Sequence, residues 1–209
     1  MPAAGLGKEG RYSCVDGGYH LMHRLTLVAS LPEVGQRDLV LPNGRDVENR
    51  SLNGSMAAEL GCAGMILCGT DGSARLTAQR LGWSALPTEA LRARNLGDWA
   101  GCSLPVLAEH DFDAVTRFQR EMSFVPPGGE SLLDVADRLK GWLKDVSTSA
   151  AGRSVAVVEP GVVRAMVAVV LAAPEAMQRL DVEPLSTTVL TKSSAGWRVR
   201  SVSSRGLRG

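Results

Sequence analysis

Residues 155–172 read VAVVEPGVVRAMVAVVLA, and they contain a strand, a break and a helix in direct succession. The first four residues are apolar and mostly β-branched, which is typical of a strand buried on both faces. Glu159, Pro160 and Gly161 interrupt this run, and an apolar helix is expected over residues 162–172. A buried strand that leads directly into a helix is the repeating unit of an α/β layered domain.

Two further apolar runs, at residues 25–28 and 65–68, predict two more buried strands. Residues 187–191 and 197–202 instead alternate between apolar and polar side chains. The short polar segment between them is typical of a turn, so these residues predict a C-terminal β-hairpin.

Helices are expected between the predicted strands, over residues 74–81 and 105–121 and from Ser131 onward. Asp134 lies three residues after Ser131, in the spacing of a capping box, and apolar residues then recur with the helical period. Together, these elements predict an α/β fold, a three-layer α/β/α sandwich around a mainly parallel sheet.

The composition is that of one ordinary globular domain. The chain has 209 residues, of which 44% are hydrophobic, and a net charge of +1 gives no reason to expect a nucleic-acid or membrane partner. Its four cysteines form no C-x-x-C pair, which favours free thiols and a cytoplasmic location, and its three histidines lack accompanying ligands, so we expect no metal and no cofactor. Residues 1–21 are expected to form a disordered extension, and residues 22–209 a single domain.

The functional site of such a sheet is expected beyond the carboxyl ends of its parallel strands. The segments that follow the three apolar strands contain no Arg, Lys or His, so this edge is predicted to be neutral to acidic. The candidate ligand-binding residues there are Ser30, Glu33, Asp71, Ser73 and Glu159.

Several motifs resemble those of a known family when they are read in order. Residues 96–101 (LGDWAG), residues 126–131 (PPGGES), Arg138, and residues 161–164 (GVVR) are similar to blocks of the histidine phosphatase (phosphoglycerate mutase-like) superfamily. The resemblance extends over residues 24–202 and is strongest to the branch that contains α-ribazole phosphatases. It implies the same fold class that the strand and helix pattern predicts.

The same resemblance implies that the catalytic residues of the family are missing. Residues 29–31 (ASL) replace an Arg-His-Gly triplet whose histidine is the phosphorylated nucleophile. The old pocket positions are Ala29, Ser30, Ser73, Ala93 and Glu159, where the family has two arginines, an acid and two histidines. The resemblance therefore implies a pseudoenzyme that acts in binding or scaffolding. Its partner would be an unknown small molecule or protein, and a homodimer remains one option.

Two interpretations of Glu159 stay open at this point. The first is an enzyme repurposed to non-phosphate chemistry, in which burial makes Glu159 a general acid or base. The second is that Glu159 pairs with Arg24, Arg45 or Arg164 and fills the old pocket. Ser30 lacks a neighbouring base that would activate it as a nucleophile, and Glu130 is expected to stabilise the start of the following helix.

Overall fold

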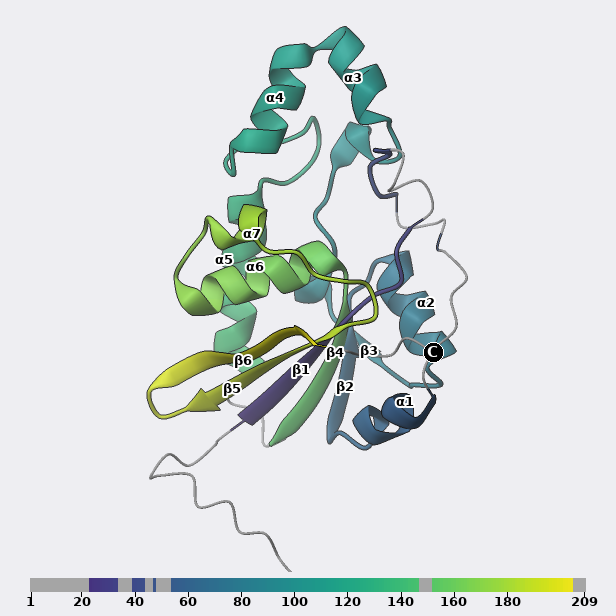
Figure 1. Cartoon of the computed structure of the whole chain (residues 1–209), viewed down its shortest axis with the longest axis vertical. Helices are drawn as coiled ribbons and strands as arrows, with labels where there is room; N and C mark the ends of the chain where they lie inside the picture. The colour runs from purple at the N-terminus through teal and green to yellow at the C-terminus, as the bar shows by residue number, and fades with distance from the viewer. Residues whose placement is uncertain (1–22, 34–38, 44–46, 48–53, 147–151, 205–209) are drawn as a thin grey trace, which may run out of the picture.

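The computed structural model describes residues 23–33, 39–43, 47, 54–146 and 152–204 (Figure 1). The predicted extension over residues 1–21, and the predicted start of the domain at residue 22, lie outside the described residues.

A six-stranded sheet forms the centre of the molecule, with the strand order β3-β2-β4-β1-β5-β6. The strands are β1 (His23–Ala29), β2 (Met65–Cys68), β3 (Leu86–Pro87), β4 (Arg153–Val158), β5 (Thr187–Ser193) and β6 (Gly196–Ser204). The first four pair in parallel, while β5 is antiparallel to β1 and forms the C-terminal hairpin with β6. The predicted α/β fold with a mainly parallel sheet is thus confirmed, as are its three apolar strands and its hairpin.

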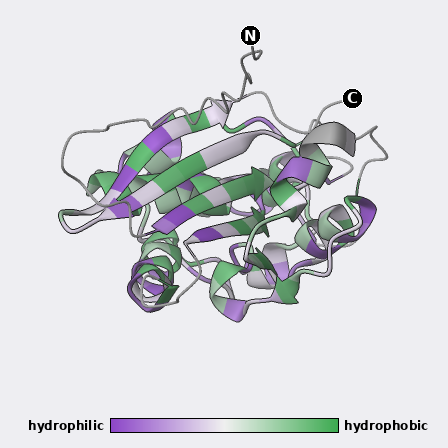
Figure 2. Cartoon of the chain, turned by 90° about the horizontal axis from the view of Figure 1, so that it is seen from below, coloured by the Kyte–Doolittle hydropathy of each residue, from purple (hydrophilic) through white to green (hydrophobic). Residues whose placement is uncertain are grey.

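Helices cover both faces of this sheet. They are α1 (Gly54–Gly61), α2 (Gly72–Arg80), α3 (Leu104–His110), α4 (Phe112–Arg120), α5 (Leu132–Val146), α6 (Pro160–Leu171) and α7 (Ala176–Arg179), with 3-10 turns η2 (Glu89–Leu91) and η3 (Gly97–Trp99). On one face, Leu27 of β1 packs in a cluster with residues of α5 and α6. On the other face, Val28 packs in a cluster with residues of α1 and α2. Successive strand residues point to opposite faces, so the apolar runs along the central strands supply both interfaces (Figure 2).

The prediction of one helix over residues 105–121 is wrong, because the chain breaks at Asp111. The backbone of Asp111 leaves the helical region at φ −152°, and its Oδ1 atom accepts a hydrogen bond of 2.8 Å from the amide of Ala114. Asp111 therefore caps a new helix, and α3 and α4 form a hairpin that projects away from the sheet (Figure 1). Phe118 of α4 packs against Trp99 and Phe124.

The capping box predicted at Ser131 is present at the start of α5. The amide of Asp134 donates to Ser131 Oγ at 3.0 Å, and the amide of Ser131 donates to Asp134 Oδ2 at 2.9 Å. The hydrogen bonds from Ser131 also hold the pKa of Asp134 below its usual value. This reciprocal pair fixes the beginning of α5 and the loop before it.

The parallel strands place their carboxyl ends at one edge of the sheet. Ser30 follows β1, Gly69 follows β2 and Glu159 follows β4 at this edge, whereas His23 begins β1 at the opposite edge. None of the helices in the described part of the chain is long and apolar enough to cross a membrane.

Candidate functional site

Ser30 and Ser73 fill the centre of the carboxyl edge. Their hydroxyl oxygens are 3.2 Å apart, and Ser73 Oγ donates a hydrogen bond of 2.9 Å to Asp71 Oδ1. Both serine side chains are buried, with exposures of 0% and 1%. Because Ser73 donates its proton to Asp71, Ser30 is the donor to Ser73, and both hydroxyls are bonded inside the protein and closed to a ligand from solvent.

Asp71 connects this pair to the loop that contains Ala93. Its Oδ1 atom also accepts from the amide of Ala74 at 3.0 Å, which caps α2. Its Oδ2 atom accepts from the amide of Ala93 at 3.1 Å. The carboxylate of Asp71 is thus committed to three hydrogen bonds that hold the edge together.

Glu159 is the half-buried N-cap of α6, and its Oε2 atom accepts a hydrogen bond of 2.7 Å from the amide of Gly161. Burial raises the pKa of Glu159, and the negative charges of Asp71 and Glu33 act in the same direction. The positive charge of Arg164 and the hydrogen bond from Gly161 lower this pKa, but burial outweighs them.

None of the described residues forms an ion pair with Glu159, so the structure does not support the expected pairing. Arg24 is exposed in β1, near the opposite edge of the sheet, and Arg45 lies outside the described residues. Arg164 is near enough to influence the pKa of Glu159, but no nitrogen of Arg164 lies within 4 Å of a carboxylate oxygen of Glu159.

Arg164 lies on the second turn of α6 and is half-buried. Its guanidinium forms no hydrogen bond or ion pair with any described residue. The Nη2 atom folds back over Gly161, where it lies 3.5 Å from the position that a Cβ atom would occupy. Glu159 Oε2 lies 2.6 Å from the same position, so a side chain at residue 161 would displace the carboxylate of Glu159, whereas its distance to Arg164 is an ordinary van der Waals contact.

A cavity of about 410 Å³ lies beside these two groups, with Glu159 and Arg164 in its wall. The rest of the wall is mainly apolar, with Leu96, Phe118, Leu132, Val135, Val162 and Met177 from α4, α5, α6, α7 and the loop before η3. Two further cavities, of about 680 and 690 Å³, lie nearby, and Pro42 lines all three.

Three arginines also lie at this edge, beside its carboxyl groups. Arg92 and Arg94 come from the loop after η2, and Arg164 comes from α6, so none lies in the segments that directly follow the strands. Arg94 is already engaged, because its Nε atom donates to Glu130 O at 2.7 Å and its Nη2 atom to Phe124 O at 2.9 Å. The sequence alone could indicate that Arg164 lies near this edge, because it follows Glu159 by five residues at the start of the same helix.

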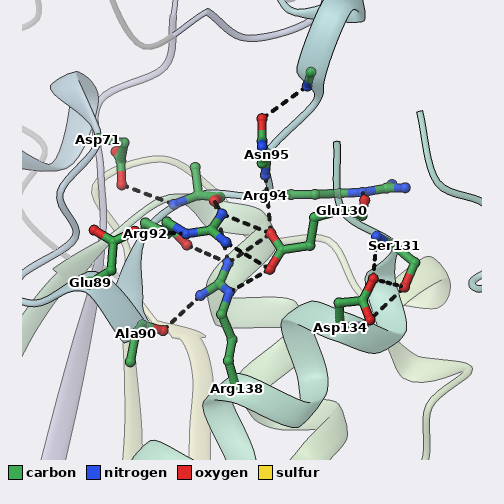
Figure 3. Close-up of polar contacts among 12 residues, drawn as sticks. Asp71, Glu89, Ala90, Arg92, Arg94, Asn95, Glu130, Ser131, Asp134 and Arg138 are labelled. Carbon is green, nitrogen blue, oxygen red and sulfur yellow. Dashed lines mark hydrogen bonds and ion pairs between the residues drawn. The ribbon is translucent and has the colours of Figure 1, made fainter. Parts of the chain in front are cut away.

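Glu130 is the centre of a buried ion-pair network (Figure 3). Its two carboxylate oxygens accept from Arg92 at 2.9 and 3.1 Å and from Arg138 Nε at 2.9 Å. Burial raises the pKa of Glu130, but hydrogen bonds from Arg138 and from the amide of Asn95, with the two positive charges, bring it below its usual value. The network joins the loop of residues 90–95 to α5. Glu130 therefore has a structural role, as expected, and it exerts this role through ion pairs.

The sequence comparison agrees with this geometry. Residues 70–205 match the family model described as histidine phosphatase superfamily (branch 1). The chain belongs to the histidine phosphatase superfamily. No curated protein matches the sequence significantly.

Solved structures of other proteins share the fold of this superfamily member. A putative α-ribazole-5′-P phosphatase from Escherichia coli is 17% identical with a TM-score of 0.75, and the match covers 90% of this chain and 98% of that one. An α-ribazole phosphatase from Shigella flexneri is 17% identical, with a TM-score of 0.71 and coverages of 89% and 98%. A mycobacterial glucosyl-3-phosphoglycerate phosphatase is 18% identical, with a TM-score of 0.69 and coverages of 88% and 99%. At such identities the likeness extends to the fold alone.

The structure of this histidine phosphatase superfamily member places the candidate residues at one edge. Ser30, Ser73 and Asp71 form one hydrogen-bonded chain, and Ala93 adjoins Asp71 through its amide. Glu33 is buried at 5% exposure, and its Oε2 atom accepts from the amide of Asn43 at 2.8 Å. The described residues contain no group of three His, Cys, Asp or Glu side chains that could hold a metal ion.

Proposed function

We propose that this member of the histidine phosphatase superfamily has lost phosphohistidine chemistry and acts as a binding protein. The observation that carries the proposal is the sealed chain of Ser30, Ser73 and Asp71 at the end of β1. By resemblance, Ser30 occupies the place of the nucleophilic histidine. A phosphohistidine requires an imidazole, and a serine with no neighbouring base is not activated for attack.

The positions of the histidines support this proposal. His23 is buried at the opposite edge of the sheet, His110 is exposed at the end of α3, and His20 lies outside the described residues. Among the described residues, no imidazole lies at the carboxyl edge.

The electrostatics of the edge also disfavour a phosphate dianion. Ser73 stands where the family resemblance places a phosphate-binding arginine, and each charge-assisted hydrogen bond from arginine is worth about 1.5–3 kcal/mol. Arg92 is near, but its guanidinium is paired with Glu130 and Glu89. The carboxyl groups of Asp71 and Glu33 lie at this edge and would oppose added negative charge, as would Glu159 in its ionised form.

The test is an assay of the purified full chain with p-nitrophenyl phosphate. We expect no release of p-nitrophenol above that of a buffer control, with the Ser30→Ala variant indistinguishable from the unaltered protein. Turnover that follows the protein through purification and disappears in Ser30→Ala would overturn the proposal.

A second candidate, a repurposed enzyme, is favoured by the raised pKa of Glu159 and by the cavity beside it. A carboxyl group that titrates closer to neutral pH is a more effective general acid or base. An uncharged ester such as p-nitrophenyl acetate is a suitable probe. Hydrolysis that is lost in Glu159→Gln but kept in Glu109→Gln, an exposed residue of α3, would favour this candidate over the binding protein.

A further inference from the structure

The unpartnered guanidinium of Arg164 points to a ligand. Arg164 is half-buried in the wall of the 410 Å³ cavity, and it forms no hydrogen bond or ion pair with any described residue. A guanidinium carries five N–H donors in a planar arrangement that matches a carboxylate. Leaving a partly desolvated cation without a partner is unfavourable, and an anionic ligand would relieve that cost.

The cavity wall specifies the rest of such a ligand. Phe118, Leu132, Val135, Val162 and Met177 line the same cavity as Arg164 and make its wall mainly apolar. Its volume of about 410 Å³ lies within the range of roughly 300–1,000 Å³ that is usual for small-molecule sites.

We propose that this cavity binds a small monocarboxylic acid with an apolar body. Its carboxylate pairs with the guanidinium of Arg164, and its body lies against Phe118, Leu132 and Met177. The inference deepens the proposed binding function and rests on it, because it assigns a ligand class to the same edge of the sheet.

A monoanion fits better than the other charge types. Arg164 is the one cation in the wall without a protein partner among the described residues, since Arg94 donates to Glu130 O and Phe124 O. A phosphate dianion is more strongly hydrated and would place a second negative charge near Glu159. An amine would place a positive charge beside Arg164.

Glu159 supports the carboxylate instead of repelling it when its carboxyl group is protonated. Burial raises the pKa of Glu159, which extends the pH range in which its neutral form can donate a hydrogen bond. Its Oε2 atom is occupied by the amide of Gly161, so Oε1 is the oxygen that remains for a ligand.

The test is calorimetric titration of the unaltered full chain with three probes that share a phenyl group: 4-phenylbutyrate, 4-phenylbutyramide and phenyl phosphate. We expect 4-phenylbutyrate to bind at least about ten-fold more tightly than the amide or the phosphate, as one charge-assisted hydrogen bond implies. The inference is overturned if the amide binds equally well, if phenyl phosphate binds more tightly, or if no probe binds up to about 10 mM.

Two variants locate the site. Arg164→Met should weaken 4-phenylbutyrate about ten- to hundred-fold and leave the amide unchanged. Arg153→Met is the matched control, because Arg153 is exposed at the opposite edge of the sheet, and it should change neither affinity. Equal affinity of Arg164→Met and the unaltered protein for 4-phenylbutyrate would refute the inference.

The outcomes of this test and of the phosphatase assay are distinguishable. Turnover of p-nitrophenyl phosphate refutes the proposed loss of phosphatase chemistry, whatever binds in the cavity. Absence of both turnover and carboxylate binding refutes only the assigned ligand class. If Arg164→Met fails to fold, the comparison of the three probes on the unaltered protein still decides the question.

Discussion

Replacing Glu159 by glutamine removes the charge of a half-buried carboxyl group and keeps its shape. Glutamine still accepts the hydrogen bond from the amide of Gly161, so the cap of α6 is preserved. Because no described residue forms an ion pair with Glu159, the variant breaks no pair. We therefore expect Glu159→Gln to raise the free energy of unfolding at neutral pH, since a poorly solvated charge is removed.

The pH dependence of this gain follows from the direction of the pKa shift. Burial raises the pKa of Glu159 in the folded state above its ordinary value of 4.5. Between the ordinary pKa and the raised pKa, the folded state therefore binds more protons than the unfolded state. Wild-type stability therefore falls as pH rises through this window, and the glutamine variant avoids the loss. The advantage of the variant grows by at most about 1.4 kcal/mol per pH unit and then levels off.

Thermal unfolding of both proteins, followed by circular dichroism from pH 5 to pH 8, measures this difference. For each pH unit within this window, the Tm of Glu159→Gln should rise by about 3–5 °C relative to that of the unaltered protein, for a chain of this length. Glu109→Gln, at an exposed position of α3, is the control and should leave Tm unchanged. A lower Tm for Glu159→Gln across this range would refute the reasoning and restore the interpretation in which Glu159 forms an ion pair.

Three other substitutions or conditions test the remaining contacts. Burial and Lys192 lower the pKa of His23, so stability should fall as pH drops below the ordinary value of 6.5, and a urea titration of His23→Gln should show a weaker fall. Glu130→Gln should lower the free energy of unfolding by about 3 kcal/mol, because it leaves the partly buried guanidinium of Arg138 without its counter-charge and removes one of the two carboxylates paired with Arg92. Gly97→Ala should lower soluble yield and Tm sharply, because residue 97 has φ +56° and a Cβ atom there would clash with Pro127 O.

The sequence was sufficient to predict the sheet because its central strands are short, continuous apolar runs. Residues 155–158 and 65–68 have no competing helical period. Both form strands in the structure, fully buried over residues 155–158 and buried at the last two of residues 65–68. The failure over residues 105–121 has a local cause. The apolar spacing continues across Asp111, but the side chain of Asp111 hydrogen-bonds to the amide of Ala114 and starts a new helix.

The position of the candidate site was predictable from the sequence, but the contacts of its side chains were not. The rule that ligands bind beyond the carboxyl ends of parallel strands correctly brought Ser30, Asp71 and Glu159 to one edge. It could not show that Ser30 is sealed against Ser73, or that Arg94 reaches the same edge from a loop. Such placements depend on tertiary packing, which sequence spacing does not encode directly.

The hydrogen-bonded chain of Ser30, Ser73 and Asp71 also bears on whether a histidine could be accommodated at residue 30. An imidazole at residue 30 would have to occupy a position with 0% exposure, where the hydroxyl of Ser73 lies 3.2 Å away. Displacing Ser73 would in turn remove one of the three hydrogen bonds that Asp71 accepts. The single substitution Ser30→His would therefore be destabilising, so a histidine at this position requires further substitutions around it.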